Sequence, residues 1–166
     1  AYCELYDSSK LDEARKLFPR AGTYDNVDDL IAGEEFDMAC VVLHPRDMPD
    51  ALLKLANAGK HFMVDKQFAR KSEDLHEVVK AVRRNKITSF LNYPWRFHPA
   101  MQELRRIIGE GKLGKPISVE SRMCVNQVRP GIRDPGAFLY LDTTEGGGIL
   151  HMLACHLVDL MRFQMG

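Results

Sequence analysis

The sequence has no excess of charge of either sign and no long hydrophobic run. Its 166 residues include 23 lysines and arginines against 23 aspartates and glutamates, so the formal net charge at pH 7 is zero. A nucleic-acid-binding domain usually carries a basic surplus, so this balance argues against that class. No apolar stretch approaches the roughly 20 residues that span a bilayer, and the first residues lack the pattern of a signal peptide. We therefore expect neither a nucleic-acid partner nor a membrane partner.

The sequence also lacks cysteine pairs and several common catalytic motifs. Its four cysteines, Cys3, Cys40, Cys124 and Cys155, are scattered and form no C-x-x-C pair, which fits a reducing cytoplasm as the expected location. No G-x-S-x-G, H-E-x-x-H or P-loop motif occurs, so hydrolase and kinase chemistry have no support. His151 and Cys155 lie four residues apart on a predicted helix, but two ligands make no metal site. We expect no metal.

What the sequence does contain is an alternation of strand-like and helix-like segments. Apolar runs predict strands at residues 2–6, 38–43, 61–64 and 87–91, and the helical period predicts helices at 10–18, 27–32, 47–58 and 72–84, the last capped by Ser72. Repeated strand–helix–strand units predict an α/β fold with a Rossmann-type parallel sheet. Such sheets bind ligands at the carboxyl ends of their strands. The residues that follow the strands are therefore binding candidates, namely Asp7, His44, Pro45, Asp65, Lys66 and Asn92.

The pattern changes after about residue 97. A helix is predicted over 99–109, a long strand over Ile117–Cys124, an irregular stretch over 126–145, and a final helix after Gly146–Gly148. An irregular stretch of this length inside a compact domain is usually functional or disordered. The strand has no visible partner in the chain, and an unpaired apolar strand is a liability. We therefore expect the rest of a second sheet to lie outside this sequence.

Four segments carry a family resemblance. Residues 56–66 (ANAGKHFMVDK) are similar to EAGKHVLVEKP, residues 92–99 (NYPWRFHP) to NYRFHP, residues 111–119 (GKLGKPISV) to GRLGEI-SV, and residues 146–160 (GGGILHMLACHLVDL) to GGGxLLDxGxHxxDL. In this order and spacing the segments resemble the glucose-fructose oxidoreductase / inositol dehydrogenase / MocA family. They span residues 56–160 of the chain, and together they are far more specific than any one of them alone.

The resemblance implies an organisation in two domains. Residues 1–96 would form part of a Rossmann domain that binds NAD(H) or NADP(H), and residues 97–166 the beginning of a C-terminal α+β domain with a mostly antiparallel sheet. The first strand and the G-x-G-x-x-G loop, which holds a pyrophosphate at a helix N-terminus, would lie upstream, so we expect a fragment or a truncated gene. The implied activity is oxidation or reduction of a sugar, inositol or related polyol by a full-length homo-oligomer.

Asp7 is the candidate residue for cofactor selectivity. By the resemblance, an acidic residue here accepts hydrogen bonds from the adenosine ribose and repels a 2′-phosphate, which favours NAD over NADP. The sequence Asp7-Ser8-Ser9 also has the pattern of a helix N-cap, so a structural role stays open. Lys10 nearby leaves NADP as an alternative cofactor.

Lys66 and His156 are the candidate catalytic residues. The resemblance implies that Lys66 lies near the substrate hydroxyl and the nicotinamide, where a lysine can move a proton or bond the reacting oxygen. Imidazole titrates near neutral pH, which suits His156 to the same proton step. The alternatives are a solvated surface lysine and a packed histidine bonded to Asp159. The remaining candidates are His44, Pro45, Asp65, Asn92 and Arg96 with Lys66 for the cofactor, and Arg133 and Met152 with Lys66 and His156 for the substrate.

Two residues depart from the family's pattern. Gln67 stands where the family has a proline, often with a cis bond, so Lys66 is expected to be aimed differently. Met152 stands where the family often has aspartate, and a thioether cannot orient or charge-stabilise a histidine. Both departures keep open a catalytically silent relative that binds a cofactor or ligand. A third reading is a short chain whose lone strand pairs with a partner's sheet.

The final helix can be laid out at about 100° per residue. This places His156, Met152 and Asp159 on one flank of an apolar stripe that begins at Ile149 and Leu150. His151 and Cys155 fall on the opposite face. For Gly146–Gly148 both a close approach to a ligand and a flexible hinge stay open. Trp95 and His98 are weaker candidates for lining the cleft, and Arg129 is a weaker candidate for contact with substrate hydroxyls or a carboxylate.

Overall fold

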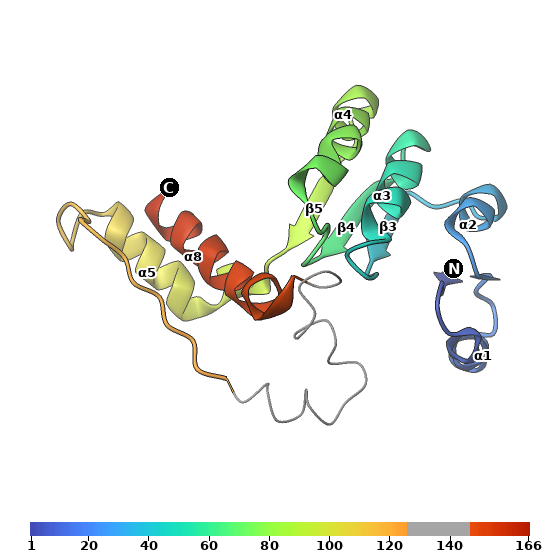
Figure 1. The fold of residues 1–166 in the computed structure, drawn as a ribbon, viewed down its shortest axis with the longest axis horizontal. Coiled ribbons are helices and arrows are strands. Elements are labelled where there is room, and N and C mark those ends of the chain that lie inside the picture. The colour runs from blue at the N-terminus through green and yellow to red at the C-terminus, as the bar shows by residue number, and fades with distance from the viewer. Residues whose placement is uncertain (126–146) are drawn as a thin grey trace. The chain divides into compact units, whose positions relative to one another are not determined.

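The computed structural model describes residues 1–125 and 147–166. The predicted irregular stretch, with Arg129, Arg133 and Gly146, lies outside the described residues. The chain forms two compact units. Unit 1 comprises residues 1–42, 47–64 and 71–90, and unit 2 comprises residues 43–46, 65–70 and 91–166. Figure 1 traces the elements of both units along the chain. The domain boundary expected near residue 96 stays a prediction.

A two-stranded parallel sheet begins unit 1. β1 (Tyr2–Cys3) pairs with β2 (Thr23–Tyr24), and α1 (Ser8–Leu17) connects them. β1 is shorter than the predicted run because the chain bends at Leu5, where the Glu4 carboxylate accepts a hydrogen bond from the N–H of Tyr6 at 3.0 Å. The bend commits that N–H to a side chain rather than to a neighbouring strand.

The next helix follows its predicted cap. α2 (Val27–Gly33) begins after Asn26, whose side chain accepts a hydrogen bond from the N–H of Asp29 at 2.8 Å. At the end of α2, a Cβ on Gly33 would lie 2.7 Å from the Tyr24 hydroxyl. Glycine therefore lets the helix end pack closely against β2.

The main sheet has three strands in the order β3–β4–β5. β3 (Met38–Val41) and β4 (His61–Asp65) are parallel, and β5 (Ser89–Asn92) lies on the other side of β4. The predicted Rossmann-type parallel arrangement is confirmed, although β3 ends two residues early and β5 begins two residues late. The last residues of β4 and β5 belong to unit 2.

α3 (Met48–Asn57) supplies more of the buried core of unit 1 than any other described element. Its buried residues repeat at helical spacing and are Met48, Ala51, Leu52, Leu55 and Ala56. The helix gives way to Gly59, whose φ of 71° is accessible to glycine without steric cost. α4 (His76–Asn85) packs against α3, and the Asn85 amide donates a hydrogen bond to the carbonyl of Ala56 at 2.6 Å.

Ser72 does not cap α4, contrary to the prediction. Ser72–Leu75 form a 3-10 turn, η1, before α4 begins at His76. The Ser72 hydroxyl donates a hydrogen bond to the Glu73 carboxylate at 3.0 Å. A charged acceptor next in sequence competes well for a hydroxyl hydrogen, so this serine turns to its neighbour rather than to the helix.

Two packed helices form the body of unit 2. α5 (Pro99–Gly109) packs against α8 (Cys155–Met165), and the two lie side by side in Figure 1. The 3-10 turn η2 (Pro94–Phe97) leads into α5. His98 caps α5, because its Nδ1 accepts a hydrogen bond from the N–H of Ala100 at 3.2 Å.

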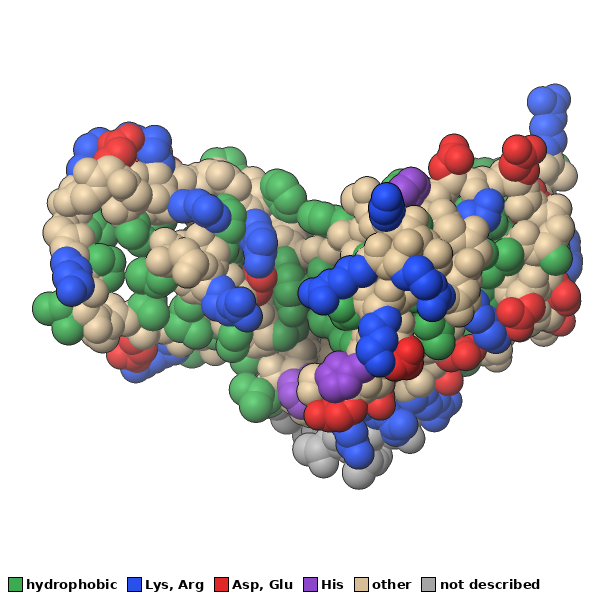
Figure 2. All heavy atoms as spheres, turned by 90° about the horizontal axis from the view of Figure 1, so that it is seen from above, with side chains coloured by type: hydrophobic (Ala, Val, Ile, Leu, Met, Phe, Trp, Pro, Cys, Tyr) green, Lys and Arg blue, Asp and Glu red, His purple; other side chains and the backbone are tan. Residues whose placement is uncertain are grey.

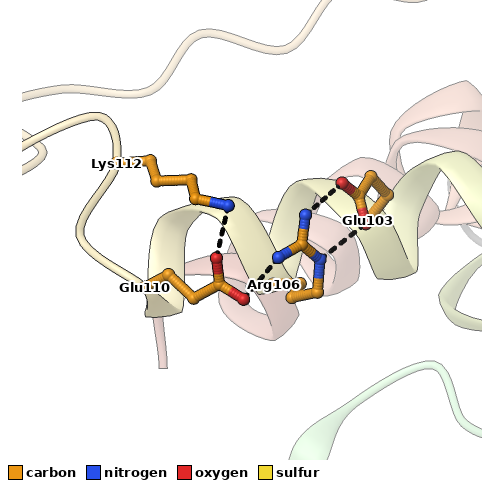
Figure 3. A network of polar contacts seen from close by, with 4 residues as sticks. All are labelled: Glu103, Arg106, Glu110 and Lys112. Carbon is orange, nitrogen blue, oxygen red and sulfur yellow. Dashed lines mark hydrogen bonds and ion pairs between the residues drawn. The ribbon is translucent and has the colours of Figure 1, made fainter.

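The outer face of α5 carries a chain of ion pairs. Arg106 bonds both Glu103 and Glu110, and Lys112 bonds Glu110 at 2.6 Å (Figure 3). All four side chains are at least two-fifths exposed, so solvent screens these pairs and each contributes little to stability.

A π-helical turn, η4 (Leu150–Ala154), interrupts the predicted final helix. The N–H of Cys155 donates to the carbonyl of Leu150, five residues back. A π turn takes more residues per turn than an α-helix, so the first turn is out of register with α8. Ile149 and Leu150, predicted in the buried stripe, are therefore 50% and 66% exposed, whereas Leu160 is buried.

The strand predicted over Ile117–Cys124 is not formed. Residues 115–125 have no helical or strand structure, and Ile117 is 99% exposed. An isolated strand is not stable, because its backbone groups need partners, and no partner strand occurs in the part of unit 2 that the structure describes. An antiparallel sheet is accordingly not seen within residues 91–125 and 147–166.

The surface agrees with the balanced composition. Basic and acidic side chains both appear on the face drawn in Figure 2. Across residues 1–125 and 147–166, no helix combines the length and apolar character needed to cross a membrane.

Candidate functional site

Unit 2 gathers the chain segments that follow three strands. Residues 43–46 follow β3, residues 65–70 contain the end of β4, and residues from 91 onward contain the end of β5. This is the edge at which a parallel sheet binds ligands. Most of the predicted cofactor and catalytic residues therefore belong to one compact unit, namely His44, Pro45, Asp65, Lys66, Asn92, Arg96 and His156.

Lys66 is held by a backbone carbonyl. Its Nζ donates a hydrogen bond to the carbonyl oxygen of Met152 at 2.9 Å, and its side chain is partly buried. The peptide bond between Lys66 and Gln67 is cis. Residue 152 is the position where the family resemblance led us to expect a carboxylate. Its main chain, rather than its side chain, provides the oxygen that meets the lysine.

His156 lies against two aromatic rings. The indole of Trp95 stacks on the imidazole with ring centroids 4.7 Å apart and an interplanar angle of 20°. Tyr93 meets the imidazole edge-on, with centroids 5.6 Å apart. His156 is only 7% exposed, and within the described residues its buried Nδ1 has no hydrogen-bond partner. The alternative predicted from the sequence was a packed histidine bonded to a neighbour such as Asp159. The packing is found, but Nδ1 makes no such bond.

The surroundings of His156 favour its neutral form. Burial lowers the pKa of this imidazole below its ordinary value of 6.5, and the ammonium of Lys66 lowers it further. The carboxylates of Asp65 and Asp159 oppose this shift without overcoming it. The neutral ring dominates at pH 7, so His156 can accept a proton.

Tyr93 and Cys155 form an uncharged pair beside His156. The Tyr93 hydroxyl and the Cys155 thiol are hydrogen-bonded, and burial raises the pKa of Tyr93 to about 12. Burial also raises the pKa of the Cys155 thiol. Cys155 was predicted on an outer face with His151, but it is partly buried against Tyr93, whereas His151 is exposed. No cluster of three metal-ligating side chains occurs in the described parts of the chain.

Arg96 is engaged by Asp159. Its Nε donates to Oδ2 of Asp159 at 2.7 Å, and its Nη2 donates to Oδ1. The Asp159 side chain is 7% exposed, and the guanidinium also lies 5.4 Å from the centroid of the Phe163 ring. Sequence analysis proposed Arg96 for the cofactor and missed this pair. The available signal was that Arg96 and Asp159 belong to two of the four motif-like segments.

Gln67 and Gly147 are the other unusual positions of this unit. Both polar atoms of the Gln67 amide are buried without a hydrogen-bond partner among the residues described. Gly147 has a φ of 73°, and a Cβ on it would lie 1.9 Å from Nδ1 of His151. Glycine is thus needed there for packing, and neither the hinge nor the ligand reading of the glycine run is tested.

Asp7 belongs to unit 1, where it caps α1. Its Oδ1 accepts hydrogen bonds from the Ser9 hydroxyl at 2.6 Å and from the Ser9 N–H at 3.0 Å. These bonds, the hydroxyl bond first, lower the pKa of the exposed Asp7 carboxyl. The predicted cap is therefore confirmed. Both cap bonds use Oδ1, so the cap leaves the geometry of Oδ2 compatible with a ribose contact, which stays a prediction.

Two residues of unit 2 fit a nicotinamide cofactor in their chemistry. Lys66 offers a cation, and His156 offers a buried nitrogen that has no partner within the described chain. Buried polar atoms without partners are rare in proteins, and each requires a reason such as a ligand or water.

The fold and these residues define an oxidoreductase-type Rossmann protein, and comparison with known proteins identifies its family. Residues 5–93 match the oxidoreductase family with an NAD-binding Rossmann fold, and residues 101–166 match the GFO/IDH/MocA C-terminal domain. The chain belongs to the GFO/IDH/MocA oxidoreductase family.

Individual relatives agree with this assignment. The chain is 32% identical over 139 residues to glucose-fructose oxidoreductase domain-containing protein 2 of Xenopus laevis, covering 82% of this chain and 34% of that protein. It is 27% identical over 151 residues to inositol 2-dehydrogenase of Rhizobium meliloti, covering 88% and 43%. The fold is similar to that of the WlbA dehydrogenase of Bordetella pertussis, solved with NADH and UDP-GlcNAcA, with a TM-score of 0.81, 20% identity and coverage of 99% and 46%. The chain spans less than half the length of these relatives.

Proposed function

We propose that the protein containing this chain is an NAD(P)-dependent oxidoreductase that transfers hydride between nicotinamide and a sugar, inositol or related polyol. Family membership supports the reaction class. The names of relatives, an inositol 2-dehydrogenase and a levoglucosan dehydrogenase, support the substrate class. One observation within unit 2 carries the proposal. Lys66 is hydrogen-bonded to the carbonyl of Met152, and its charge acts on the imidazole of His156.

The proton step falls to Lys66 and His156. A bound nicotinamide would supply the hydride acceptor for oxidation of the substrate carbon, and the substrate hydroxyl would have to lose its proton. The neutral His156 has a buried Nδ1 with no described partner, so it can take that proton directly or through Lys66. The ammonium of Lys66 stabilises the developing alkoxide. In the reverse direction, the same groups return a proton to the carbonyl oxygen.

Cofactor contacts would come from the strand-end residues. Asp7 would accept hydrogen bonds from the adenosine ribose, and its negative charge would disfavour a 2′-phosphate. His44 and Pro45 lie after β3, and Asp65 and Asn92 are the last residues of β4 and β5, linked by a contact of 3.4 Å. The charge of Asp7 favours NAD, with NADP as the alternative.

We also propose a cytoplasmic location and a homo-oligomeric state. The four cysteines are free thiols, which supports a reducing compartment such as the cytoplasm. A homo-oligomeric full-length protein is part of the proposal and rests on the family resemblance alone.

Two alanine variants of the natural-length protein test the proton step. Loss of a positioned acid or base typically lowers turnover by about 10²–10⁴-fold, so Lys66→Ala and His156→Ala are each expected to do so. Lys60→Ala is the matched lysine control, because Lys60 Nζ also donates to a backbone carbonyl, that of Phe36 at 2.7 Å. His76→Ala is the histidine control, because His76 is exposed.

The measurement is kcat for the best substrate from a sugar and polyol screen, with NADH binding followed separately. Both controls should stay within about twofold of the wild type, since they lack contact with reacting groups. Wild-type turnover that survives the combined change of Lys66 and His156 would sink the proposal.

A catalytically silent relative is the second candidate, and Met152 is the observation that favours it. Methionine leaves Lys66 with a neutral carbonyl as its described partner where a carboxylate was expected. A silent relative would bind NADH without turning over any substrate of the screen. The screen separates the two candidates because only an enzyme shows wild-type turnover.

A further inference from the structure

We propose that the Arg96–Asp159 ion pair is a positioning device for His156, fixing the turn that carries the rings of its pocket to the helix that carries the imidazole. This inference deepens the proposed function and rests on it for the catalytic role of His156. Arg96 and Asp159 are positioning residues in this account, since neither is placed on reacting atoms.

The first argument is connectivity. Arg96 and Trp95 are adjacent in η2, and Asp159 and His156 lie three residues apart in α8, so each end of the ion pair is on the same element as one member of the ring stack. Two parallel hydrogen bonds join a planar guanidinium to a carboxylate in one geometry, as they do here. The pair therefore restricts sliding and rotation of η2 against α8, and with it the stack of Trp95 on His156.

The second argument is burial. The Asp159 carboxylate is 7% exposed and requires a partner, because an unpaired buried charge is strongly unfavourable. The Arg96 guanidinium supplies that partner and is itself packed near Phe163. The turn is further secured because the Gln102 amide donates a hydrogen bond to the carbonyl of Arg96. The buried carboxylate distinguishes this pair from the pairs of α5, in which both partners are exposed, although the Arg96 side chain is itself 41% exposed.

The third argument is electrostatic. The charged and titratable groups around the imidazole are Lys66, Asp65 and Asp159, with Tyr93 and Cys155 uncharged at neutral pH. Asp159 acts to raise the pKa of His156. A guanidinium bonded to that carboxylate is expected to offset part of this effect, so the two ends of the ion pair should act on the imidazole with opposite sign.

The direction in which the pKa of His156 changes tests this proposal, because a merely structural ion pair would not give opposite changes in two variants. In the natural-length protein, Asp159→Asn should lower the pKa of His156, because the favourable carboxylate is gone while Arg96 keeps its charge. Arg96→Met should raise it, because Asp159 keeps its charge without a partner. The two shifts are expected to be opposite in sign. The readout is NMR titration of the His156 ring, assigned with His156→Ala.

Arg106→Met is the matched control. Arg106 also bonds two carboxylate side chains in unit 2, but on the exposed face of α5 (Figure 3). The Arg106→Met variant should leave the pKa of His156 at the wild-type value. If Arg96→Met fails to fold, Arg96→Lys keeps the charge and loses the paired hydrogen bonds. In that variant the ring-current shift that Trp95 stacking imposes on His156 should be lost, whereas the pKa should change less than in Asp159→Asn.

The outcomes are distinguishable from those of the proposed function. Opposite pKa shifts in Asp159→Asn and Arg96→Met support the positioning role even if no substrate is found. A His156 titration and ring-current shift identical in Asp159→Asn, Arg96→Lys and Arg106→Met would overturn it, even if the wild-type protein is an active dehydrogenase. Loss of turnover in all variants, the control included, would count against the proposal in the same way.

Discussion

At the scale of single residues, Met152 is the main departure from the family's pattern. A thioether, which carries no charge and accepts hydrogen bonds only weakly, occupies the position expected for a carboxylate, yet the carbonyl of the same residue accepts a hydrogen bond from Lys66 at 2.9 Å. A neutral carbonyl leaves the ammonium charge uncompensated, and that charge is one of the two causes that lower the pKa of His156. The substitution therefore favours a histidine that is neutral and ready to accept a proton.

Met152→Asp tests this interpretation. A new carboxylate near Lys66 should neutralise its effect and raise the pKa of His156 by roughly one unit, as followed by NMR titration. Met152→Leu is the control, because it keeps the backbone carbonyl and changes side-chain volume little. The acid limb of turnover should move to higher pH in Met152→Asp alone, since protonated His156 cannot act as a base.

The same variant separates an adapted enzyme from a silent relative. An enzyme adapted to methionine should lose turnover on Met152→Asp, whereas a silent relative gains turnover or stays inactive. Equal His156 titrations in the aspartate and leucine variants would contradict the electrostatic account of residue 152.

At the scale of elements, the sequence predicted what depends on local spacing and caps. The apolar period of α3 and the Asn26 cap of α2 are found where they were expected. The π turn before α8 could not be predicted, because its residues have no local signal and its carbonyl at Met152 is used by Lys66, 86 residues away. The prediction of a strand over Ile117–Cys124 was wrong for a related reason. Alternation of apolar and polar residues does not by itself supply the neighbouring strand with which a β-strand must pair.

Two glycines test whether backbone conformation or side-chain space limits these elements. Gly59 follows α3 with a φ of 71°, and Gly109 ends α5 without a positive φ; an added Cβ meets nothing within 4 Å at either. Gly59→Ala should therefore lower the free energy of unfolding by about 1–2 kcal/mol through left-handed strain alone. Gly109→Ala should leave it unchanged or raise it by up to about 1 kcal/mol.

Denaturant unfolding of both variants in the natural-length protein measures the difference. Equal stability of the two variants would show that the turn after α3 adopts another conformation.

At the scale of the whole molecule, the order of the motif-like segments along the chain identified the family. Four motif-like segments and the strand–helix alternation predicted the Rossmann-type sheet and the family, both of which are confirmed. The candidate site was predicted only as residues at strand ends. The stack of Trp95 on His156 and the Arg96–Asp159 pair join segments about 60 residues apart, and no local pattern specifies which distant side chains will meet.

The central claim is that the protein binds a nicotinamide cofactor at this site, and a titration of the natural-length protein with NADH tests it most directly. Nicotinamide fluorescence reports binding, and NADPH provides the comparison. The account predicts saturable binding of NADH that is tighter than binding of NADPH, because the ionised Asp7 carboxylate repels a 2′-phosphate. A folded natural-length protein that binds neither NADH nor NADPH would contradict the account.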